Sequence, residues 1–381
     1  MSTRGPPFAR DRMLKFAPMR SESRIRIAPA QNLYGLSRME IARCLGGFGA
    51  PAYHADQVFQ WIYGRGVFDP DRWTDLPRAL RSQLAASARV SPGHLEERTV
   101  AADRTVKYGV HLAGGGRVEA VAMVDRERVT LCISSQVGCA LDCDFCLTGK
   151  MGLVRHLSPG EIAGQVALMR EEGHVGDRPC NVVFMGMGEP LHNYDAVIAA
   201  FRLLTDPRGF GLSRRRITVS TSGLAPAIER LAREPAGPRL AVSLNATTDE
   251  VRSRLMPVNS KYPIARLLAA CRAFATATGD RLTFEYVLLE GVNDHDADVS
   301  RLARLLRSFP AKLNLIPFNP VPGWIFYSPT TKERVLAIRD HLLAMRVPVS
   351  IRWSRGREAR AACGQLALLP EAPAPVKEGP P

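Results

Sequence analysis

Short apolar runs, separated by amphipathic stretches of helical length, fill the chain from about residue 129 to residue 355. Seven runs are rich in β-branched or large apolar residues, which is typical of buried strands. They are RVTLCISS (128–135), NVVFM (181–185), RITVS (216–220), RLAVSL (239–244), LTFEYVLL (282–289), KLNLIPF (312–318) and VPVSIRW (347–353). Strands that alternate with helices predict a parallel sheet with helices outside it. We therefore expect an α/β fold, a full or partial (β/α) barrel, with its chemistry on the loops after the strands.

Helix start signals mark two places along the chain. Ser37 and Glu40 form the S-x-x-E pattern of a capping box, which predicts a helix that runs through Cys44. The stretch SPGE (158–161) repeats the pattern, with proline at the first helical position. HADQVFQWIYGRGV (54–67) has the spacing of a second amphipathic helix in the N-terminal region.

Composition divides the chain into four regions. Residues 1–30 hold seven Arg or Lys and no apolar segment of the secretory kind, so we expect a disordered basic extension, although transit peptides are similarly arginine-rich. Residues 31–95 predict a small helical domain that binds RNA. Residues 96–365, which begin with strand-like alternation, predict the catalytic domain. Residues 366–381 are rich in proline and alanine and predict a disordered tail.

The charge balance is strongly basic. The chain has 51 Lys and Arg against 37 Asp and Glu, a formal net charge of +14. This excess favours a polyanionic partner, nucleic acid first, although a generally solvated basic surface would give the same count. No run approaches the roughly 18 apolar residues of a membrane span. Five of the eight cysteines are scattered, which is typical of a reducing compartment. We therefore expect a cytoplasmic protein without a membrane partner.

Three cysteines lie within eight residues, CALDCDFC, directly after a predicted strand. Cys139, Cys143 and Cys146 have the spacing C-x3-C-x2-C. A structural zinc site takes four ligands, usually as paired C-x2-C units, and the chain has no second pair. Three thiolates can instead hold a [4Fe–4S] cluster and leave one iron open for chemistry. Zinc with a distant fourth ligand and buried free thiols remain the alternatives.

Polar motifs end four of the predicted strands. They are MGMGEPL (185–191), VSTSG (219–223), VSLNA (242–246) and IPFNP (316–320). In the first, two glycines allow a close backbone approach to a ligand, and Glu189 offers a carboxylate to an ammonium group. A glycine-rich turn with a solvated glutamate is the plainer interpretation of that motif alone. The dinucleotide fingerprint G-x-G-x-x-G is absent from the chain.

Two further cysteines flank the predicted site. Cys363, in AACGQL, lies between small residues and follows an arginine-rich loop, an electropositive setting that favours a thiolate. Cys132 lies seven residues before the cysteine motif. Each alone is most often a small buried apolar residue. Together they predict a redox or nucleophilic pair.

Five stretches together resemble the dual-specificity RNA methyltransferases of the radical S-adenosylmethionine superfamily. They are LCISSQVGCALDCDFC, VVFMGMGEPL, STSG, NLIPFNP and AACGQL. The resemblance covers about residues 31 to 366, including FQWIYGRGV. It implies a barrel-like radical core, a [4Fe–4S] cluster whose open iron binds S-adenosylmethionine, and an electron donor such as flavodoxin or ferredoxin. It also implies methylation of adenine C2 in the peptidyl-transferase region of 23S rRNA and beside the anticodon in tRNA.

The resemblance further implies roles for single residues. The cluster ligands are Cys139, Cys143 and Cys146, and the S-adenosylmethionine contacts are Gly188, Glu189, Ser220, Ser243, Leu244, Asn245 and Asn319. Cys363 is methylated first, and a second S-adenosylmethionine gives the radical that takes a hydrogen atom from that methyl group. The carbon radical adds to the adenine, and Glu119 matches the family's proton acceptor. Cys132 then attacks Cys363, and the resulting disulfide releases the product.

Two positions depart from the family's pattern. Asn245 stands where histidine is frequent, and GREA (356–359) stands where Gly-x-Asp-Ile is usual. Both affect the fine specificity more than the reaction. For phosphate contact we expect the helical domain, SRRR (213–216), Arg155 and the loop 352–360.

Three other functions remain open. Methylation at adenine C8, as in related antibiotic-resistance methyltransferases, would share nearly all of these motifs. A radical enzyme that acts on a peptide would leave the cysteine pair without a purpose. A non-catalytic RNA-binding protein that holds zinc belongs to a different class altogether.

Overall fold

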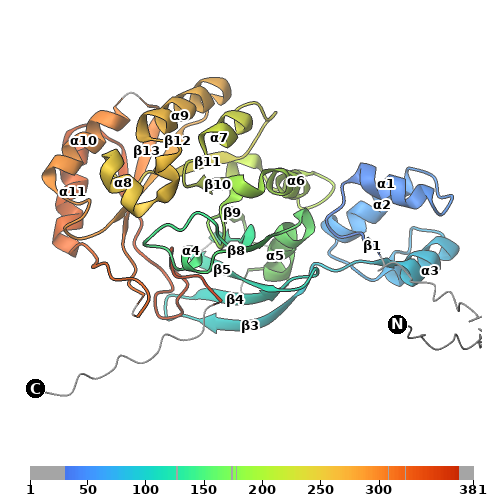
Figure 1. The fold of residues 1–381 in the computed structure, drawn as a ribbon. Helices are drawn as coiled ribbons and strands as arrows, with labels where there is room; N and C mark the ends of the chain where they lie inside the picture. The colour runs from blue at the N-terminus through green and yellow to red at the C-terminus, as the bar shows by residue number, and fades with distance from the viewer. Residues whose placement is uncertain are drawn as a thin grey trace, which may run out of the picture.

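One large sheet carries the greater part of the molecule, and a small helical module stands beside it (Figure 1). The computed structural model describes residues 31–368, apart from 126–127, 173–174, 177, 308 and 322. The predicted extension over residues 1–30 therefore lies outside the described residues. Within the described part of the chain, no helix is long and apolar enough to cross a membrane.

The sheet has ten strands in the order β14-β13-β12-β11-β10-β9-β6-β5-β4-β3. In chain order they are β3 (His94–Val100), β4 (Thr105–His111), β5 (Arg117–Asp125), β6 (Arg128–Cys132), β9 (Cys180–Phe184), β10 (Ile217–Thr221), β11 (Arg239–Ser243), β12 (Leu282–Leu288), β13 (Ala311–Pro317) and β14 (Val349–Ile351). Strands β6 and β9 to β14 pair in parallel, whereas β3 to β6 are antiparallel. Each of the seven predicted strands overlaps one of these, so the α/β class is confirmed.

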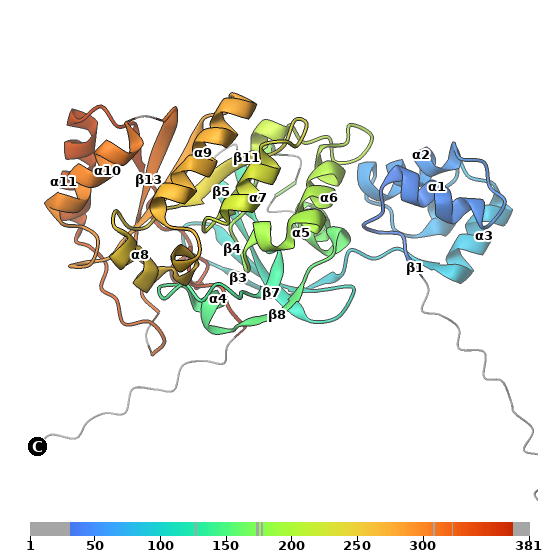
Figure 2. The same cartoon turned by 45° about the horizontal axis from the view of Figure 1, so that its top comes forward.

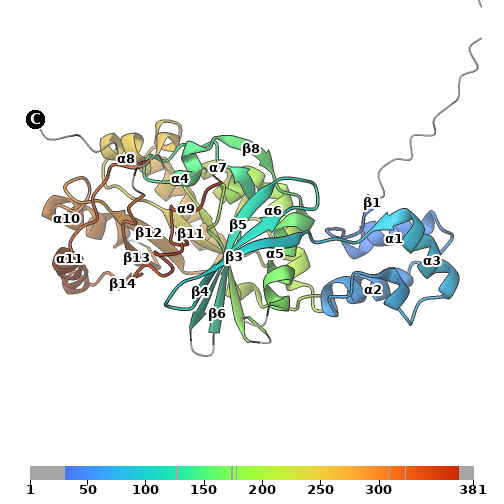
Figure 3. The ribbon, with the colours of Figure 1, turned by 90° about the horizontal axis from the view of Figure 1, so that it is seen from below.

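The sheet curls around its inner face (Figure 3). Thr130 on β6, Thr218 on β10 and Lys312 on β13 line one cavity, which side chains from a flat sheet would not do. Among the described residues, the end strands β3 and β14 do not pair with each other. The barrel is therefore partial, and its inner face is the place where strands far apart in the sheet meet.

Helices cover the outer face of the parallel strands (Figure 2). They are α5 (Pro159–Glu171), α6 (Tyr194–Thr205), α7 (Ala225–Leu231), α9 (Ile264–Thr278), α10 (Asp296–Leu306) and α11 (Lys332–Ala344). The smaller elements β7 (Gln136–Gly138), α4 (Leu147–Lys150), β8 (Leu153–His156) and α8 (Asp249–Leu255) follow strand ends. This arrangement places polar strand ends and the cysteine motif on one side of the barrel.

Both predicted capping boxes are confirmed. The Glu40 N–H donates to Ser37 Oγ at 3.3 Å, and the Ser37 N–H donates to the Glu40 carboxylate at 2.7 Å. In α5, the Glu161 N–H donates to Ser158 Oγ at 3.2 Å, and the Ser158 N–H donates to Glu161 at 2.9 Å. Each box satisfies backbone donors that a helix start leaves unpaired.

The N-terminal module differs in detail from its prediction. Its elements are β1 (Gln31–Asn32), α1 (Arg38–Gly46), α2 (His54–Phe59), α3 (Arg78–Ser87) and β2 (Ala88–Arg89). The second helix, predicted over 54–67, is α-helical only to Phe59 and ends in a π-helical turn, Gln60–Gly64. The wider turn brings Gly64 so close to the Arg208 carbonyl that a Cβ would lie 2.9 Å from its oxygen. Contact with the loop after α6 therefore overrides the simple helical repeat.

The module meets the barrel through two glycines. Gly35 crosses the start of α5 at Gly160, and a Cβ at Gly160 would lie 2.5 Å from the Tyr34 carbonyl oxygen. Ion pairs flank this joint: Arg38 lies 3.3 Å from the Asp206 carboxylate. Backbone packed directly on backbone leaves no space for a side chain, so the joint is rigid.

Gly160→Ala is expected to lower the free energy of unfolding by about 1–3 kcal/mol, because the methyl group overlaps the Tyr34 carbonyl. Urea unfolding followed by circular dichroism measures the change. Gly46→Ala is the matched control, since a Cβ at this helical glycine meets nothing within 4 Å. Equal stability of the two variants would show that the joint yields without cost.

The end of the described chain is packed on the barrel. Thr148 Oγ1 donates to the Leu366 carbonyl at 2.5 Å, the Ala367 N–H donates to Glu119 Oε2 at 2.9 Å, and the Leu368 N–H lies 3.4 Å from Met151 Sδ. Residues 366–368, at the start of the predicted tail, are thus hydrogen-bonded to the barrel. Residues 369–381 of the predicted tail lie outside the described residues.

Candidate active site

The cysteine motif forms a turn between β7 and α4. Gly138 at the end of β7 and Asp142 inside the turn both have positive φ, 75° and 46°, which lets the chain reverse tightly. Cys139, Cys143 and Cys146 line one cavity of about 160 Å³. The opposite wall comes from the ends of β9 to β13, so strand ends and cysteine turn face each other.

The cysteine turn offers three thiols as ligands for an iron–sulfur cluster. All eight cysteines are free thiols. Burial raises the pKa of Cys143 well above its ordinary value, and the nearby Cys146 and Cys139 raise it further. Bound cationic iron reverses this penalty, because it deprotonates a coordinating thiol. No three His, Cys, Asp or Glu side chains in the described ranges are placed to hold one metal ion. Three thiols that line one cavity can serve as separate corners of a cluster.

The segment after β9 packs against the chain that follows β6. Gly188 has φ 97°, and a Cβ there would lie 2.5 Å from Gln136 Cβ. Glu189 is buried in the same cavity wall. Its carboxylate accepts hydrogen bonds from the Ser222 N–H at 2.8 Å, Ser222 Oγ at 2.9 Å and the Leu191 N–H at 3.0 Å. Burial raises the pKa of Glu189 although these donors favour its charged form.

The other residues predicted to contact S-adenosylmethionine differ in whether they border the cavity. Ser220 and Ser243 line the cavity, as predicted from their strand ends. Asn245 lines it too, but its Oδ1 accepts the Val287 N–H at 2.9 Å and so links β11 to β12. The Leu244 side chain is fully buried in the main apolar core and does not border the cavity. Its backbone is engaged inside the protein as well, because the Leu244 N–H donates to the Glu285 carbonyl at 2.9 Å and the Leu244 carbonyl accepts from Arg252 at 3.0 Å.

Asn319 presents an unused acceptor to the cavity. Its Nδ2 donates to the Cys363 carbonyl at 3.1 Å, whereas its Oδ1 is buried without a hydrogen-bond partner. A buried acceptor of this kind costs free energy unless a donor reaches it. A bound ligand with an N–H or O–H group would supply that donor.

Sequence reasoning missed Arg252 of α8, which is fully buried. Its guanidinium donates to the carbonyls of Leu244 at 3.0 Å, Ser222 at 2.6 Å and Ser243 at 3.1 Å. It also donates to Asn259 Oδ1 at 2.9 Å. One cation thus holds two strand ends in place. The signal in the sequence is only one arginine on a short helix, among the 51 basic residues of the chain.

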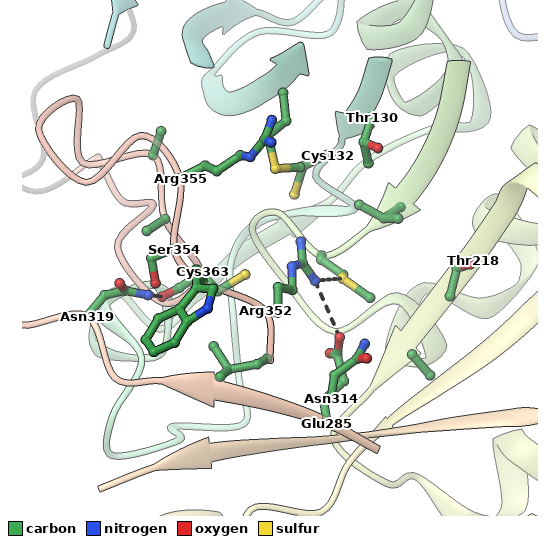
Figure 4. A pocket seen from close by; sticks show the side chains of 18 of the residues that line it. Thr130, Cys132, Thr218, Glu285, Asn314, Asn319, Arg352, Ser354, Arg355 and Cys363 are labelled. Carbon is green, nitrogen blue, oxygen red and sulfur yellow. Dashed lines mark hydrogen bonds and ion pairs between the residues drawn. The ribbon is translucent and has the colours of Figure 1, made fainter. Parts of the chain in front are cut away.

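A second cavity of about 410 Å³ lies inside the barrel, beside the first. Cys132, at the end of β6, and Cys363 both line it (Figure 4). The two cavities have five lining residues in common, namely Met185, Glu285, Ile316, Asn319 and Cys363. Cys363 therefore borders both cavities, which no pattern in the sequence indicated.

Arg352 carries the positive charge beside the two thiols (Figure 4). It follows β14, and its Nη1 lies 3.4 Å from Glu285 Oε1 and 3.2 Å from Met185 Sδ. Burial and the neighbouring Cys363 raise the pKa of Cys132 to about 12, and Arg352 opposes that rise. Arg352 thus favours the thiolate of Cys132. The sequence placed Arg352 only in a loop expected to contact RNA.

Glu119 lies on β5 and borders neither cavity among the described residues. Its Oε1 lies 2.9 Å from Lys107 Nζ, and its Oε2 accepts the Ala367 N–H. The neighbouring Leu366 does line the second cavity. One residue of the C-terminal segment therefore separates Glu119 from the thiol pair.

The arginines predicted to contact RNA fall into two groups. Arg155 lies 2.8 Å from the Glu161 carboxylate, and Arg214 lies 2.7 Å from Asp280. These two, with Arg352, are committed to contacts inside the protein. Arg215, Arg216, Arg357 and Arg360 are exposed. Only exposed side chains are available to phosphates.

Comparison with known proteins begins with two family models. The radical SAM superfamily matches residues 133–303, and the ribosomal RNA large subunit methyltransferase N-terminal domain matches residues 31–90. The dual-specificity RNA methyltransferase RlmN of Anaeromyxobacter dehalogenans is 47% identical over 343 residues, which are 88% of this chain and 91% of that protein. The chain belongs to the RlmN family of dual-specificity RNA methyltransferases.

Other members of the RlmN family agree with this assignment. The RlmN of Geobacter sulfurreducens is 48% identical, over 88% of this chain and 91% of that protein. The crystal structure of a radical SAM methyltransferase from Sphaerobacter thermophilus superposes on this chain with a TM-score of 0.84. The two sequences are 44% identical, and the match covers 88% of this chain and 99% of that one. The RlmN family and the small N-terminal domain beside a radical SAM core are thus as predicted.

Proposed function

We propose that this protein methylates C2 of an adenine in 23S rRNA and of the adenine beside the anticodon in tRNA. It works in the cytoplasm and receives electrons from a donor such as flavodoxin or ferredoxin. The supporting observation is the position of Cys363, whose side chain borders both cavities. One thiol thereby faces the cysteine turn on one side and Cys132 on the other.

The first cavity suits the cofactors. Cys139, Cys143 and Cys146, which line it together, would hold the [4Fe–4S] cluster, and three thiolates would leave one iron for S-adenosylmethionine. Around S-adenosylmethionine, the cavity offers Gly188, Glu189, Ser220, Ser243, Asn245 and the free acceptor of Asn319. When bound, the cluster and S-adenosylmethionine together would supply a carbon-centred radical. One turnover uses two S-adenosylmethionine molecules.

The cysteine pair carries the methyl group. Adenine C2 is electron-poor, so a covalent bond to an activated carbon on Cys363 divides one difficult step into easier ones. Glu119 is our proposed acceptor of the ring proton, and loss of its bond to the Ala367 N–H would free one carboxylate oxygen. Cys132 Sγ then attacks Cys363 Sγ. A disulfide forms as the bond from the Cys363 sulfur to the methylene carbon breaks. The electron pair of that bond stays on the carbon, which takes up a proton and leaves as the methyl group of the adenine. Two electrons from the donor then reduce the disulfide to the two thiols.

The second cavity suits the unstacked adenine. It has polar groups from neighbouring strands, among them Thr283, Lys312 and Asn314. Trp353, which is 46% exposed, lines it as well and offers a surface for stacking. Bringing one base out of the RNA costs a few kcal/mol, which stacking and polar contacts in this cavity offset.

Arg352→Met is expected to slow resolution of the covalent adduct about tenfold, because the thiolate fraction of Cys132 falls when the neighbouring cation is removed. Removing the cation raises the pKa of Cys132, so the remaining rate shifts toward higher pH. Decay of the protein–RNA band on denaturing gels measures the rate. Two variants serve as controls. Arg352→Lys keeps the charge at this position, and Arg355→Met removes another cation of the same loop, one that pairs with Asp125. Wild-type decay in Arg352→Met at every pH would contradict this role.

The deciding experiment is nucleoside mass spectrometry. Anaerobically reconstituted protein is incubated with reductant, S-adenosylmethionine and an adenine-containing rRNA fragment or tRNA. 2-Methyladenosine is the expected product. 8-Methyladenosine would assign the antibiotic-resistance branch with the same cysteines. Absence of any methyladenosine, with intact cluster and cleavage of S-adenosylmethionine, would refute the RNA substrate. A colourless sample that contains zinc would instead favour a non-catalytic RNA-binding protein.

A further inference from the structure

Gln136 connects the loop 187–189, on the wall of the first cavity, to two histidines. It is fully buried at the start of β7. Its amide oxygen Oε1 accepts the Glu189 N–H at 2.8 Å. Its amide nitrogen Nε2 lies 3.0 Å from His156 Nδ1 and 3.3 Å from His192 Nδ1. The two rings meet edge to face with centroids 5.0 Å apart.

These contacts fix the orientation of the amide. Because the Glu189 N–H can only donate, it requires the amide oxygen of Gln136 on its side. The NH₂ group then has two hydrogens, one for each histidine Nδ1. Both Nδ1 atoms must accept, so both rings carry their proton on Nε2 and are neutral. Burial and His192 lower the pKa of His156, which agrees with a neutral ring.

The same glutamine also fills the space next to Gly188. A Cβ on Gly188 would lie 2.8 Å from Gln136 Oε1, so the side chain rests directly on the glycine. Backbone bonds support this contact, since the Ser135 and Gln136 N–H groups both donate to the Met187 carbonyl, at 2.9 and 3.2 Å. The loop 187–189 is thus held from one side by three consecutive residues, with Ser134 Oγ accepting the Met187 N–H at 2.8 Å.

The charged groups around the histidines have partners of their own. Arg155 donates to the His156 carbonyl at 3.1 Å and pairs with Glu161. The Glu189 carboxylate, next to His192 in the chain, is held by Ser222 and Leu191. No side chain of the described residues other than Gln136 is hydrogen-bonded to the Nδ1 atom of His156 or His192.

We infer that Gln136, oriented by His156 and His192, is a positioning residue that holds the Gly188–Glu189 backbone in the shape that binds S-adenosylmethionine. This inference rests on the proposed function, which places S-adenosylmethionine in that cavity. It gives a role to Gln136, His156 and His192, which are not among the predicted site residues. The two histidines act only through the glutamine, because neither borders the first cavity.

Histidine tautomers give the first test. Long-range ¹H–¹⁵N spectra are recorded on the cluster-free protein at a pH above the ordinary histidine pKa. His156 and His192 are expected as Nε2–H tautomers. His54 is the internal control, since its Nδ1 faces the amide oxygen of Gln57 at 2.6 Å and must carry a proton. In Gln136→Glu, a carboxylate replaces the donor, so both rings are expected to move the proton to Nδ1.

Binding gives the second test. Isothermal titration of the reconstituted protein with S-adenosylmethionine is expected to show at least about fivefold weaker binding for Gln136→Leu, since the buried Glu189 N–H loses its acceptor. Gln136→Glu keeps an acceptor and is expected to bind within about twofold of wild type. Gln57→Leu changes a glutamine of the N-terminal module and should bind as wild type does. The glutamate variant keeps the test valid if the leucine variant does not fold.

The outcomes separate this inference from the proposed function. Nδ1–H tautomers of His156 and His192 in the wild-type protein, or wild-type affinity in Gln136→Leu, would overturn the positioning role alone. If the wild-type protein with its cluster bound no S-adenosylmethionine, the proposed function itself would fail, and this inference with it.

Discussion

Replacing Cys363 with alanine is expected to abolish RNA methylation, with a loss of at least about a thousandfold, while the iron–sulfur cluster stays in place. Cys363 borders both cavities but belongs to a different segment from the cysteine turn. In the proposed mechanism, its removal takes away the methyl carrier but leaves the three proposed cluster ligands in place. Methylated nucleosides and the visible absorption of the cluster are measured on the same anaerobic sample.

A matched control separates the chemistry from the loss of a thiol. Cys44→Ala removes another half-buried cysteine, one on α1 of the N-terminal module, and is expected to keep wild-type activity. Normal 2-methyladenosine from Cys363→Ala would refute the carrier role. Loss of the cluster in that variant would show instead that Cys363 supports the cysteine turn.

Cys132→Ala is expected to accumulate protein covalently joined to RNA, and multiple turnover should fall at least about a hundredfold. In the proposed mechanism, formation of the adduct needs only Cys363 and the cofactors, whereas its release needs the second thiol. Denaturing gels with labelled RNA show the adduct as a slowly migrating band. Nuclease digestion followed by mass spectrometry places the nucleotide on Cys363.

The control for this variant lies on the neighbouring strand. Cys180 is a buried free thiol on β9, and β9 pairs directly with β6, which carries Cys132. Cys180→Ala makes a similar cavity in the core, so it is expected to lose some stability but to accumulate no adduct. If Cys132→Ala turned over normally without a crosslinked band, Cys132 would have no part in release.

Local sequence patterns predicted the fold well. The seven apolar runs became strands because burial on both faces of a parallel strand demands continuous apolar residues. The capping boxes at Ser37 and Ser158 were predictable because their partners lie only three residues away. The cysteine spacing likewise indicated the cysteine turn, since all three thiols come from one short stretch.

Local sequence patterns could not predict the contacts between segments that are far apart in the chain. Glu285 lies in the middle of an apolar strand, and its partner Arg352 is 67 residues further along the chain. The bond that occupies Glu119 comes from Ala367, at a separation of 248 residues. Leu244 is predicted as an S-adenosylmethionine contact together with Ser243 and Asn245. Successive side chains of a strand point to opposite faces, however, and the Leu244 side chain lies in the core.

The segment that carries Cys363 has a consequence for biosynthesis. The Gly364 carbonyl accepts the Leu147 N–H at 2.8 Å, and Thr148 holds Leu366, so this segment closes over the cysteine turn. A ribosome completes every strand of the barrel before it makes this segment, and chains fold from the N-terminus as they emerge. The nascent barrel therefore exposes an open cysteine turn for a period. We therefore expect iron and sulfide to reach the turn most easily during that period, before residues 364–366 close over it.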